Sequence, residues 1–395
     1  MEKFLAAAKK LYRNALLVGG LAHFIHDGFT DMLYVFFPIW QAQFSLTFTE
    51  IGFLKTLFSG TMASFQVPSG HLAKRIGEIR LLLLGTVLTS ISVFLYGWAP
   101  VPVALSCLLV VGGLGSSVQH PLSSSLISNA YPDKADRRAA LSIFNVAGDV
   151  GKLLLPATVS LIISLVSWQA ASQVVGIIGL GIALVLFKKS KNVMDQHVQQ
   201  KSAACTNAAV LGKTSPGFWA LVMIGMIDSS TRMGFLTFFP FVLQEKGAGV
   251  TTIGLALSLI FAGGALGKFV CGILATKVGI IRSVVITEIL TACCIIGMLS
   301  FSLHIDIILA LFLGVALNGT SSVLYGSVPE LVSEENRNQA FAVFYTATIA
   351  SGAFSPWLYG AASDLVGINT AVILVALVVL LAIPLTIPMK GKLVG

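Results

Sequence analysis

The chain has 395 residues, of which 56% are hydrophobic and only 11% are charged. This composition excludes a soluble protein with one or two ordinary cores and predicts an integral membrane protein. The formal net charge of +8 would also suit a nucleic-acid-binding protein, so the distribution of the charges must separate these two classes.

Apolar windows follow one another along nearly the whole chain, and a membrane-spanning helix needs about 20 such residues. We therefore predict an all-α integral membrane protein with twelve transmembrane helices. The expected spans are residues 15–41, 50–72, 79–98, 102–128, 137–166, 168–188, 217–243, 251–275, 282–301, 305–330, 337–363 and 367–389.

The basic residues gather on one side of these spans. If the N-terminus is cytoplasmic, 20 of the 25 Lys and Arg residues lie in cytoplasmic segments, and only Lys246 lies in an external loop. This asymmetry follows the positive-inside rule, so we predict a multi-pass protein of the bacterial inner membrane with both termini in the cytoplasm. No basic and aromatic cluster remains outside these loops, and nucleic acid is not an expected partner.

The first span contains "LAHFIHDGFTDMLYVFFP" at residues 21–38, with ionisable groups where a bilayer tolerates them least. His23, Asp27 and Asp31 are spaced i, i+4, i+8 and share one helix face, at depths of roughly 12, 18 and 24 Å from the cytoplasmic side. His26 is expected to point elsewhere. We expect His23 and Asp27 to carry protons, and Asp31 to form a structural ion pair with Lys55 of the second span.

Polar residues at similar depth follow in later spans. His120, next to Gln119 and Pro121 in the fourth span, should be level with His23, at roughly 12 Å. In the fifth span Asn145, Asp149 and Lys152 share a face, and the seventh span brings Asp228 and Arg232 to the same region. These residues are the predicted substrate cavity: Gln119, His120, Asn145, Asp149, Lys152, Asp228 and Arg232.

Structural alternatives remain open for several of these charges. Asp149 with Lys152, and Asp228 with Arg232, could form ion pairs within one helix, because charges inside membranes are usually paired. Lys268 and Glu288 also read as a structural pair.

The chain contains an internal repeat. A polar segment at residues 188–217 separates two halves, and "FFP" at 36 recurs at 238, Ile51-Gly52 recurs at 253, and "GHLAKRIGEIR" at 70 recurs as "GILATKVGIIR" at 272, each 202 positions further on. "SSV" at 116 recurs at 321, and Phe144 and Pro156 recur as Phe344 and Pro356. We predict six-helix bundles at residues 1–189 and 216–395, joined by a cytoplasmic linker at 190–215; transporters with such repeats bind cargo near the midplane.

The stretch at 70–80 resembles the loop motif of the major facilitator superfamily, with Gly70, Arg75 and Gly77 matching and Lys74 in place of the usual acidic residue. Gly272, Lys277 and Gly279 repeat it. A narrower resemblance, to the fosmidomycin-resistance family, is carried by "HFIHD" at 23, "FSLTFTEIG" at 44, "GLGSSVQHPLSS" at 113 and "FNVAGDVGKLLLP" at 144. The resemblance implies the major facilitator fold, with spans one, four, seven and ten lining a cavity, and proton-driven export of a drug or metabolite.

We therefore expect a secondary transporter that exports a small amphipathic or anionic molecule by proton antiport. Proton-coupled uptake of a nutrient or iron chelate is the alternative, and a membrane receptor or scaffold is the third. The sequence has no phosphate-binding glycine loop, nucleophile elbow or zinc-protease pattern, so an enzyme is not expected. We expect no cofactor or metal, a proton gradient as the driving force, and a monomer with a small-molecule substrate in the lipid bilayer.

Overall fold

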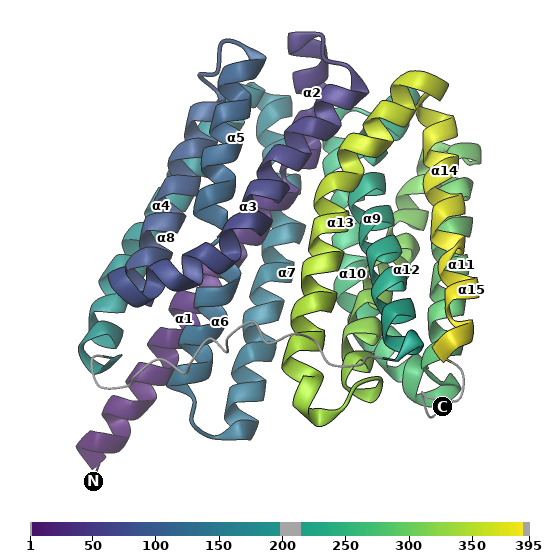
Figure 1. Ribbon diagram of the computed structural model, residues 1–395. Coiled ribbons are helices and arrows are strands. Elements are labelled where there is room, and N and C mark those ends of the chain that lie inside the picture. The colour runs from purple at the N-terminus through teal and green to yellow at the C-terminus, as the bar shows by residue number, and fades with distance from the viewer. Residues whose placement is uncertain (1, 198–214, 390–395) are drawn as a thin grey trace. The chain divides into compact units, whose positions relative to one another are not determined.

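The computed structural model describes residues 2–197 and 215–389, and all regular segments within those ranges are helical (Figure 1). Residues 190–197 of the expected linker continue the preceding helix, and residues 198–214 lie outside the described part of the chain. The fifteen α-helices are α1 Glu2–Asp31, α2 Leu33–Phe44, α3 Phe48–Ile76, α4 Glu78–Tyr96, α5 Pro102–Ser116, α6 Gln119–Ala130, α7 Lys134–Leu165, α8 Trp168–His197, α9 Pro216–Glu245, α10 Val250–Val278, α11 Ile280–Ser300, α12 Leu303–Ser327, α13 Arg337–Val366, α14 Ile368–Leu380 and α15 Ala382–Leu385. Short 3-10 turns lie at Val328–Glu330, Glu334–Asn336 and Ile387–Met389.

Eight helical segments of the described chain are long and apolar enough to cross a bilayer. The other long helices are α1, α3, α9 and α13. These four helices and the eight apolar segments make up the twelve expected spans, with α2 completing the span that α1 begins. The protein is thus a multi-pass membrane protein.

Two spans of the first half are interrupted in mid-course. The first is divided into α1 and α2 by a turn at Met32, although the Met32 N–H still donates to the Gly28 carbonyl at 2.9 Å. The fourth is divided into α5 and α6 at Ser117 and Val118, one residue before the Gln119–His120 pair. Each break therefore lies beside residues of the predicted site.

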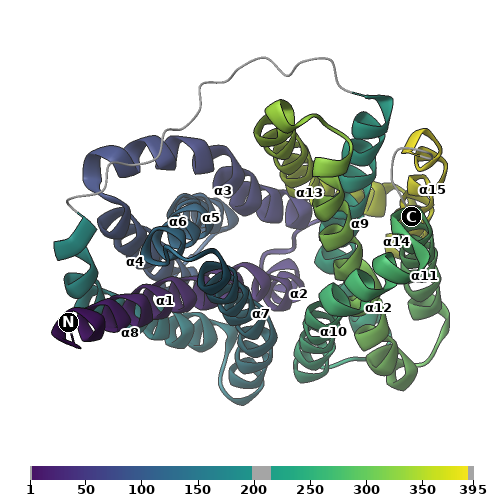
Figure 2. The same ribbon diagram turned by 90° about the horizontal axis from the view of Figure 1, so that it is seen from below.

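The chain folds as two compact units, and each is described here by itself. The first takes in α1 to Leu33 and then the chain from Leu57 through α8, whereas the second takes in Tyr34–Thr56 and the chain from α9 onward. In the first unit α1 packs against α6, α7 and α8, and α4 packs against α5 and α8. In the second, α9 packs against α13 and α10 against α12, as both views show (Figures 1 and 2).

Glycines set the closest helix approaches. A side chain at Gly151 of α7 would meet the backbone of Phe24 in α1, and one at Gly314 of α12 would meet the backbone of Ile260 in α10. Small residues at such contacts allow membrane helices to pack by van der Waals attraction without a water-driven hydrophobic force. In the first unit this close packing holds α7 against the charged face of α1.

The predicted repeat is visible in the helix boundaries. α10 begins and ends 202 residues after α3, and both are followed by a glycine with positive φ, +98° at Gly77 and +88° at Gly279. Each of these glycines ends one helix and begins the next. The same tight connection thus occurs at the same place in each half.

Candidate functional site

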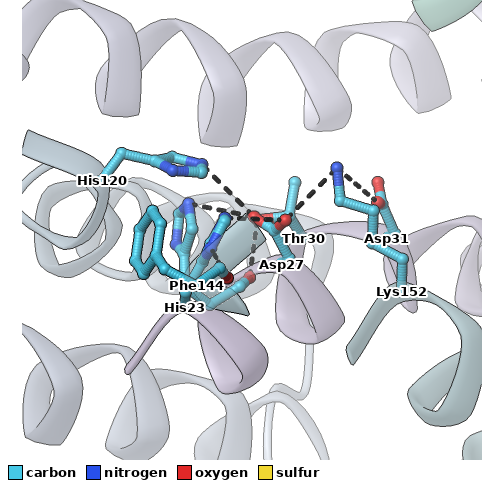
Figure 3. A network of polar contacts seen from close by, with 8 residues as sticks. His23, Asp27, Thr30, Asp31, His120, Phe144 and Lys152 are labelled. Carbon is cyan, nitrogen blue, oxygen red and sulfur yellow. Dashed lines mark hydrogen bonds and ion pairs between the residues drawn. The ribbon is translucent and has the colours of Figure 1, made fainter. Parts of the chain in front are cut away.

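The carboxylate of Asp27 is the centre of a buried polar cluster in the first unit. Asp27 is only 5% exposed. Its Oδ2 lies 3.1 Å from His23 Nε2 and 3.3 Å from Lys152 Nζ, and its Oδ1 lies 3.3 Å from His120 Nε2. Figure 3 shows the two histidines on one side of the carboxylate and the lysine on the other. Residues from α1, α6 and α7 therefore converge on one acid, including the pairing of His23 and His120 at one depth that the sequence predicts.

The hydrogen bonds of His23 fix where a proton must be. Its Nδ1 lies 2.8 Å from the carbonyl oxygen of Phe144, and its ring stacks on the Phe144 ring at 4.1 Å between centroids. A carbonyl oxygen only accepts hydrogen bonds, so Nδ1 must carry a hydrogen. Nε2 of a neutral ring would then be an acceptor facing the acceptor Oδ2 of Asp27. The 3.1 Å contact is attractive only when one proton lies between these two atoms.

Gly148 of α7 provides the space for this pair. A β-carbon at this position would lie 2.6 Å from both Asp27 Oδ2 and His23 Nε2. The Phe144 carbonyl that binds His23 is one helical turn earlier on the same helix. The segment "FNVAGDVGK" therefore supplies a backbone acceptor, an open position and a lysine in sequence order.

His26 also belongs to the cluster, although helical spacing predicted that it points elsewhere. Its Nε2 lies 3.9 Å from Asp27 Oδ1, and its ring meets the His120 ring edge to face at 4.6 Å. The imidazole is buried and long enough to reach around the helix. Helical spacing does not place His26 on the face of His23 and Asp27. The sequence feature that could have indicated its role is that it directly precedes Asp27.

Lys152 of α7 forms ion pairs with two aspartates of α1, against which α7 packs. Besides Asp27 it lies 3.9 Å from Asp31 Oδ2. Asp149, the alternative partner within α7, is half-buried, and Asn145 of the expected polar wall is exposed. The lysine thus links the two acids of α1 that lie one turn apart.

Gln119 does not join the Asp27 cluster. It is buried, and its Nε2 donates to Thr86 Oγ1 of α4 at 2.9 Å. This bond lies within the packing of α6 against α4.

The second unit contains a separate polar chain at Asp228 and Arg232. Arg232 Nη1 donates to Ser321 Oγ at 2.6 Å, and Ser321 Oγ donates to Asp228 Oδ2 at 2.6 Å. The hydroxyl from α12 therefore connects the two charges of α9, which the sequence offered as a possible direct pair. Asp228 is 4% exposed.

Asp31 and Lys55 fall in different units, and their predicted ion pair stays a prediction. Lys55 is fully buried, and its ammonium nitrogen lies 4.4 Å from the centroid of the Tyr34 ring, a cation–π contact within the second unit.

The loop motif lies at the ends of α3 and α10. Gly77 and Gly279 adopt the positive φ that favours glycine, whereas a side chain at Gly70 or Gly272 would meet open space. Arg75 and Lys277 are exposed in the last turns of these helices. The backbone requirement is therefore specific to the second glycine of each motif.

The repeat shows that four members of the Asp27 cluster have uncharged counterparts in the second half. The offset of 202 places Gly225 and Ser229 where the first unit has His23 and Asp27. The offsets of 205 and 200 set by "SSV" and Phe344 place Tyr325 and Gly352 where it has His120 and Lys152. The packing is nevertheless kept, because a β-carbon at Gly225 would meet the Phe344 ring, as His23 meets Phe144.

The profile of the Major Facilitator Superfamily matches residues 19–303 and again 219–390, which together span nearly the whole chain. The chain belongs to the Major Facilitator Superfamily. Membership of this superfamily indicates a membrane transporter rather than an enzyme.

Among curated superfamily members, the chain is 22% identical over 256 residues to a probable sulfoacetate transporter of Cupriavidus necator, covering 61% of this chain and 59% of that one. It is 25% identical over 268 residues to the fosmidomycin resistance protein of Escherichia coli, covering 66% and 64%. Both matches thus span less than two thirds of the relative's length. The crystal structure of a bacterial homologue of the human lysosomal transporter Spinster has the same fold, with a TM-score of 0.78, 16% identity and coverage of 94% of this chain and 95% of that one.

Proposed function

We propose that this superfamily member is a proton-coupled secondary transporter that exports a small amphipathic or anionic drug or metabolite by antiport and alternating access. The observation that supports coupling to protons is the contact between His23 Nε2 and Asp27 Oδ2, which requires a shared proton. We also propose that it acts as a monomer in the inner membrane, with both termini in the cytoplasm and no cofactor. The basic loops support that orientation.

The same contact suggests how export is coupled. When the shared proton leaves, His23 Nε2 and Asp27 Oδ2 become two acceptors facing one another, which is unfavourable unless a donor enters between them. A hydroxyl or amino group of the cargo can supply that donor. Proton and cargo then compete for one pair of atoms, and this competition is the requirement for antiport.

Proton-coupled uptake is the second candidate, and the position of Lys152 favours it for an anionic cargo. Lys152 is held by Asp27 at 3.3 Å as long as Asp27 is ionised. Protonation of Asp27 weakens that ion pair and leaves the ammonium group available for a carboxylate, sulfonate or phosphonate. Proton and anion then bind together, which is the requirement for symport.

Liposomes containing the purified full-length protein and an internal pH dye separate these mechanisms. The first compounds to test are fosmidomycin and sulfoacetate, which appear in the names of two relatives. Loss of protons from acid-loaded vesicles on addition of external compound supports antiport. Entry of protons together with the compound supports symport, and the absence of proton flux with a broad panel of anions and amphipaths argues against both.

Asp27→Asn tests the proposed proton site directly. Asparagine keeps the shape of the side chain but cannot exchange a proton, so we expect compound-driven proton flux to be lost while the protein still folds. Asp133→Asn is the matched control, because Asp133 caps α7 outside the membrane and asparagine caps helices equally well. Transport by Asp27→Asn with an unchanged pH dependence would show that the proton site is elsewhere.

A further inference from the structure

Glu288 of α11 is a buried acid that neither the sequence patterns nor the Asp27 cluster explains. It is 1% exposed, and its Oε1 has no hydrogen-bond partner among the described residues. The sequence suggested a structural pair with Lys268. In the described part of the chain no Lys or Arg nitrogen lies within 4.0 Å of its carboxyl group. An ionised carboxylate in such a position would be very costly.

The repeat gives a reason why Glu288 Oε1 has no hydrogen-bond donor within the ranges that the structure describes. Glu288 lies 202 positions after Thr86, whose hydroxyl in the first unit accepts a hydrogen bond from Gln119 at 2.9 Å. The counterpart of Gln119 at the "SSV" offset is Leu324, a fully buried apolar residue. The second unit therefore has a carboxyl group where the first has a hydroxyl, and a hydrocarbon where the first has a donor.

The charges nearest to Glu288 are already balanced without it. Asp228 and Arg232 of α9 are the groups that interact with it electrostatically. Arg232 is permanently charged and is joined to Asp228 through Ser321, whose hydroxyl accepts from the guanidinium and donates to the Asp228 carboxyl group. One ionised acid balances this cation, and Asp228 is the acid hydrogen-bonded to it, so ionisation of Glu288 as well would leave an unbalanced negative charge in a buried region.

The other helices packed against α11 supply no cation to Glu288. Lys268 of α10 is exposed, and Asp306 in the first turn of α12 forms an ion pair with Lys246 at 2.5 Å. α14 carries no ionisable side chain. Neither Lys268 nor the Lys246–Asp306 pair makes an ion pair with Glu288.

We propose that Glu288 is a second proton-binding site, held as a neutral carboxylic acid in the second unit and separate from the His23–Asp27 pair. The inference concerns the protonation of this chain's own residue and does not depend on the proposed antiport.

Labelling with dicyclohexylcarbodiimide tests the proposal, because this apolar reagent modifies carboxyl groups that are protonated and buried. Full-length protein in lipid nanodiscs at neutral pH is treated with the reagent, and the modified peptides are identified by mass spectrometry. We expect modification at Glu288 and none at Glu334, an exposed glutamate 3.2 Å from Arg337 that serves as an internal control. Absence of label at Glu288 overturns the proposal.

Infrared spectroscopy gives an independent measurement that needs no reagent. Glu288→Gln should remove a carbonyl stretching band of a protonated carboxylic acid, whereas Glu334→Gln should leave the spectrum in that region unchanged. Leu324→Gln provides a second variant that keeps the acid and adds the donor found in the first unit. It should shift the band to lower frequency and reduce labelling several-fold; equal spectra for the unsubstituted protein and Glu288→Gln contradict the proposal.

Discussion

At the scale of single residues, the proposed proton site depends on the cation beside Asp27. Lys152 Nζ lies 3.3 Å from Asp27 Oδ2, where its positive charge balances the ionised carboxylate. With Lys152→Gln the carboxylate loses this partner, so the acid limb of the transport profile should move to higher pH. Transport measured across a pH series in liposomes tests this shift.

The matched control for that variant is Lys134→Gln, which removes an exposed lysine at the start of the same helix. Its profile should coincide with that of the unsubstituted protein. A Lys152→Gln profile that loses amplitude without moving along the pH axis would mean that the lysine serves cargo binding alone.

Gly148 makes a second prediction at this scale. Alanine there would push its β-carbon against His23 and Asp27, and overpacking of this kind costs about 1–3 kcal/mol. We expect Gly148→Ala to lower the melting temperature and to reduce proton-coupled flux, because the His23–Asp27 contact must open. Gly181→Ala, at a position with no neighbouring atom within 4 Å, should melt at the same or a higher temperature. Equal stability of the two variants would show that the pair can shift without loss.

At the scale of helices, the connection after α3 makes a prediction for the loop motif. Gly77 has φ +98° and ψ +137°, a conformation that residues with a side chain adopt only at a cost of about 1–3 kcal/mol. Gly77→Ala should therefore destabilise the joint between α3 and α4, and a thermal melt of purified protein measures the loss. Gly70 is the first glycine of the motif and lies inside α3. An alanine side chain there meets open space, so Gly70→Ala should be tolerated. A similar melting temperature for both variants would contradict this assignment.

The helices also show what could be predicted from the sequence. Depth along each span placed His23 and His120 at one level, because helical rise converts residue number directly into position. The partner of Lys152 could not be predicted, because it depends on how closely Gly148 and Gly151 let α7 approach α1. The sequence predicts an ion pair between Glu288 and Lys268 only from their similar depth in the membrane. It does not show which way each helix face points.

At the scale of the whole molecule, one exposed carboxylate ties the first turn of α3 to α13 within the second unit. Asp364 accepts the N–H groups of Phe48 at 2.9 Å and Thr49 at 2.8 Å, together with the Thr49 hydroxyl. Partial burial favours the neutral acid, but these hydrogen bonds outweigh it and hold the pKa of Asp364 below its usual value. Its contribution to stability is therefore present above the ordinary carboxyl pKa and is lost as the pH falls through the lower pKa of the folded state.

Asp364→Asn tests this contribution through its pH dependence. At neutral pH the variant should melt at a lower temperature than the unsubstituted protein, and the difference should shrink toward zero as the medium becomes acidic, below a pH of about 4. Asp136→Asn replaces an exposed carboxylate at the start of α7 and should melt like the parent. A difference between Asp364→Asn and the parent that is independent of pH would contradict the assignment.

The turn at Met32 lies where the chain passes from the first compact unit to the second. The first span passes from one compact unit to the other just after this turn, so Asp27 and the hairpin held by Asp364 are joined through a few backbone torsions. The chain therefore changes unit directly after the interruption of the first span, within a few residues of the ionisable cluster. In the second half the corresponding helix, α9, runs unbroken from Pro216 to Glu245. The two halves therefore differ in helix continuity as well as in charge, and the helix break lies next to the ionisable cluster.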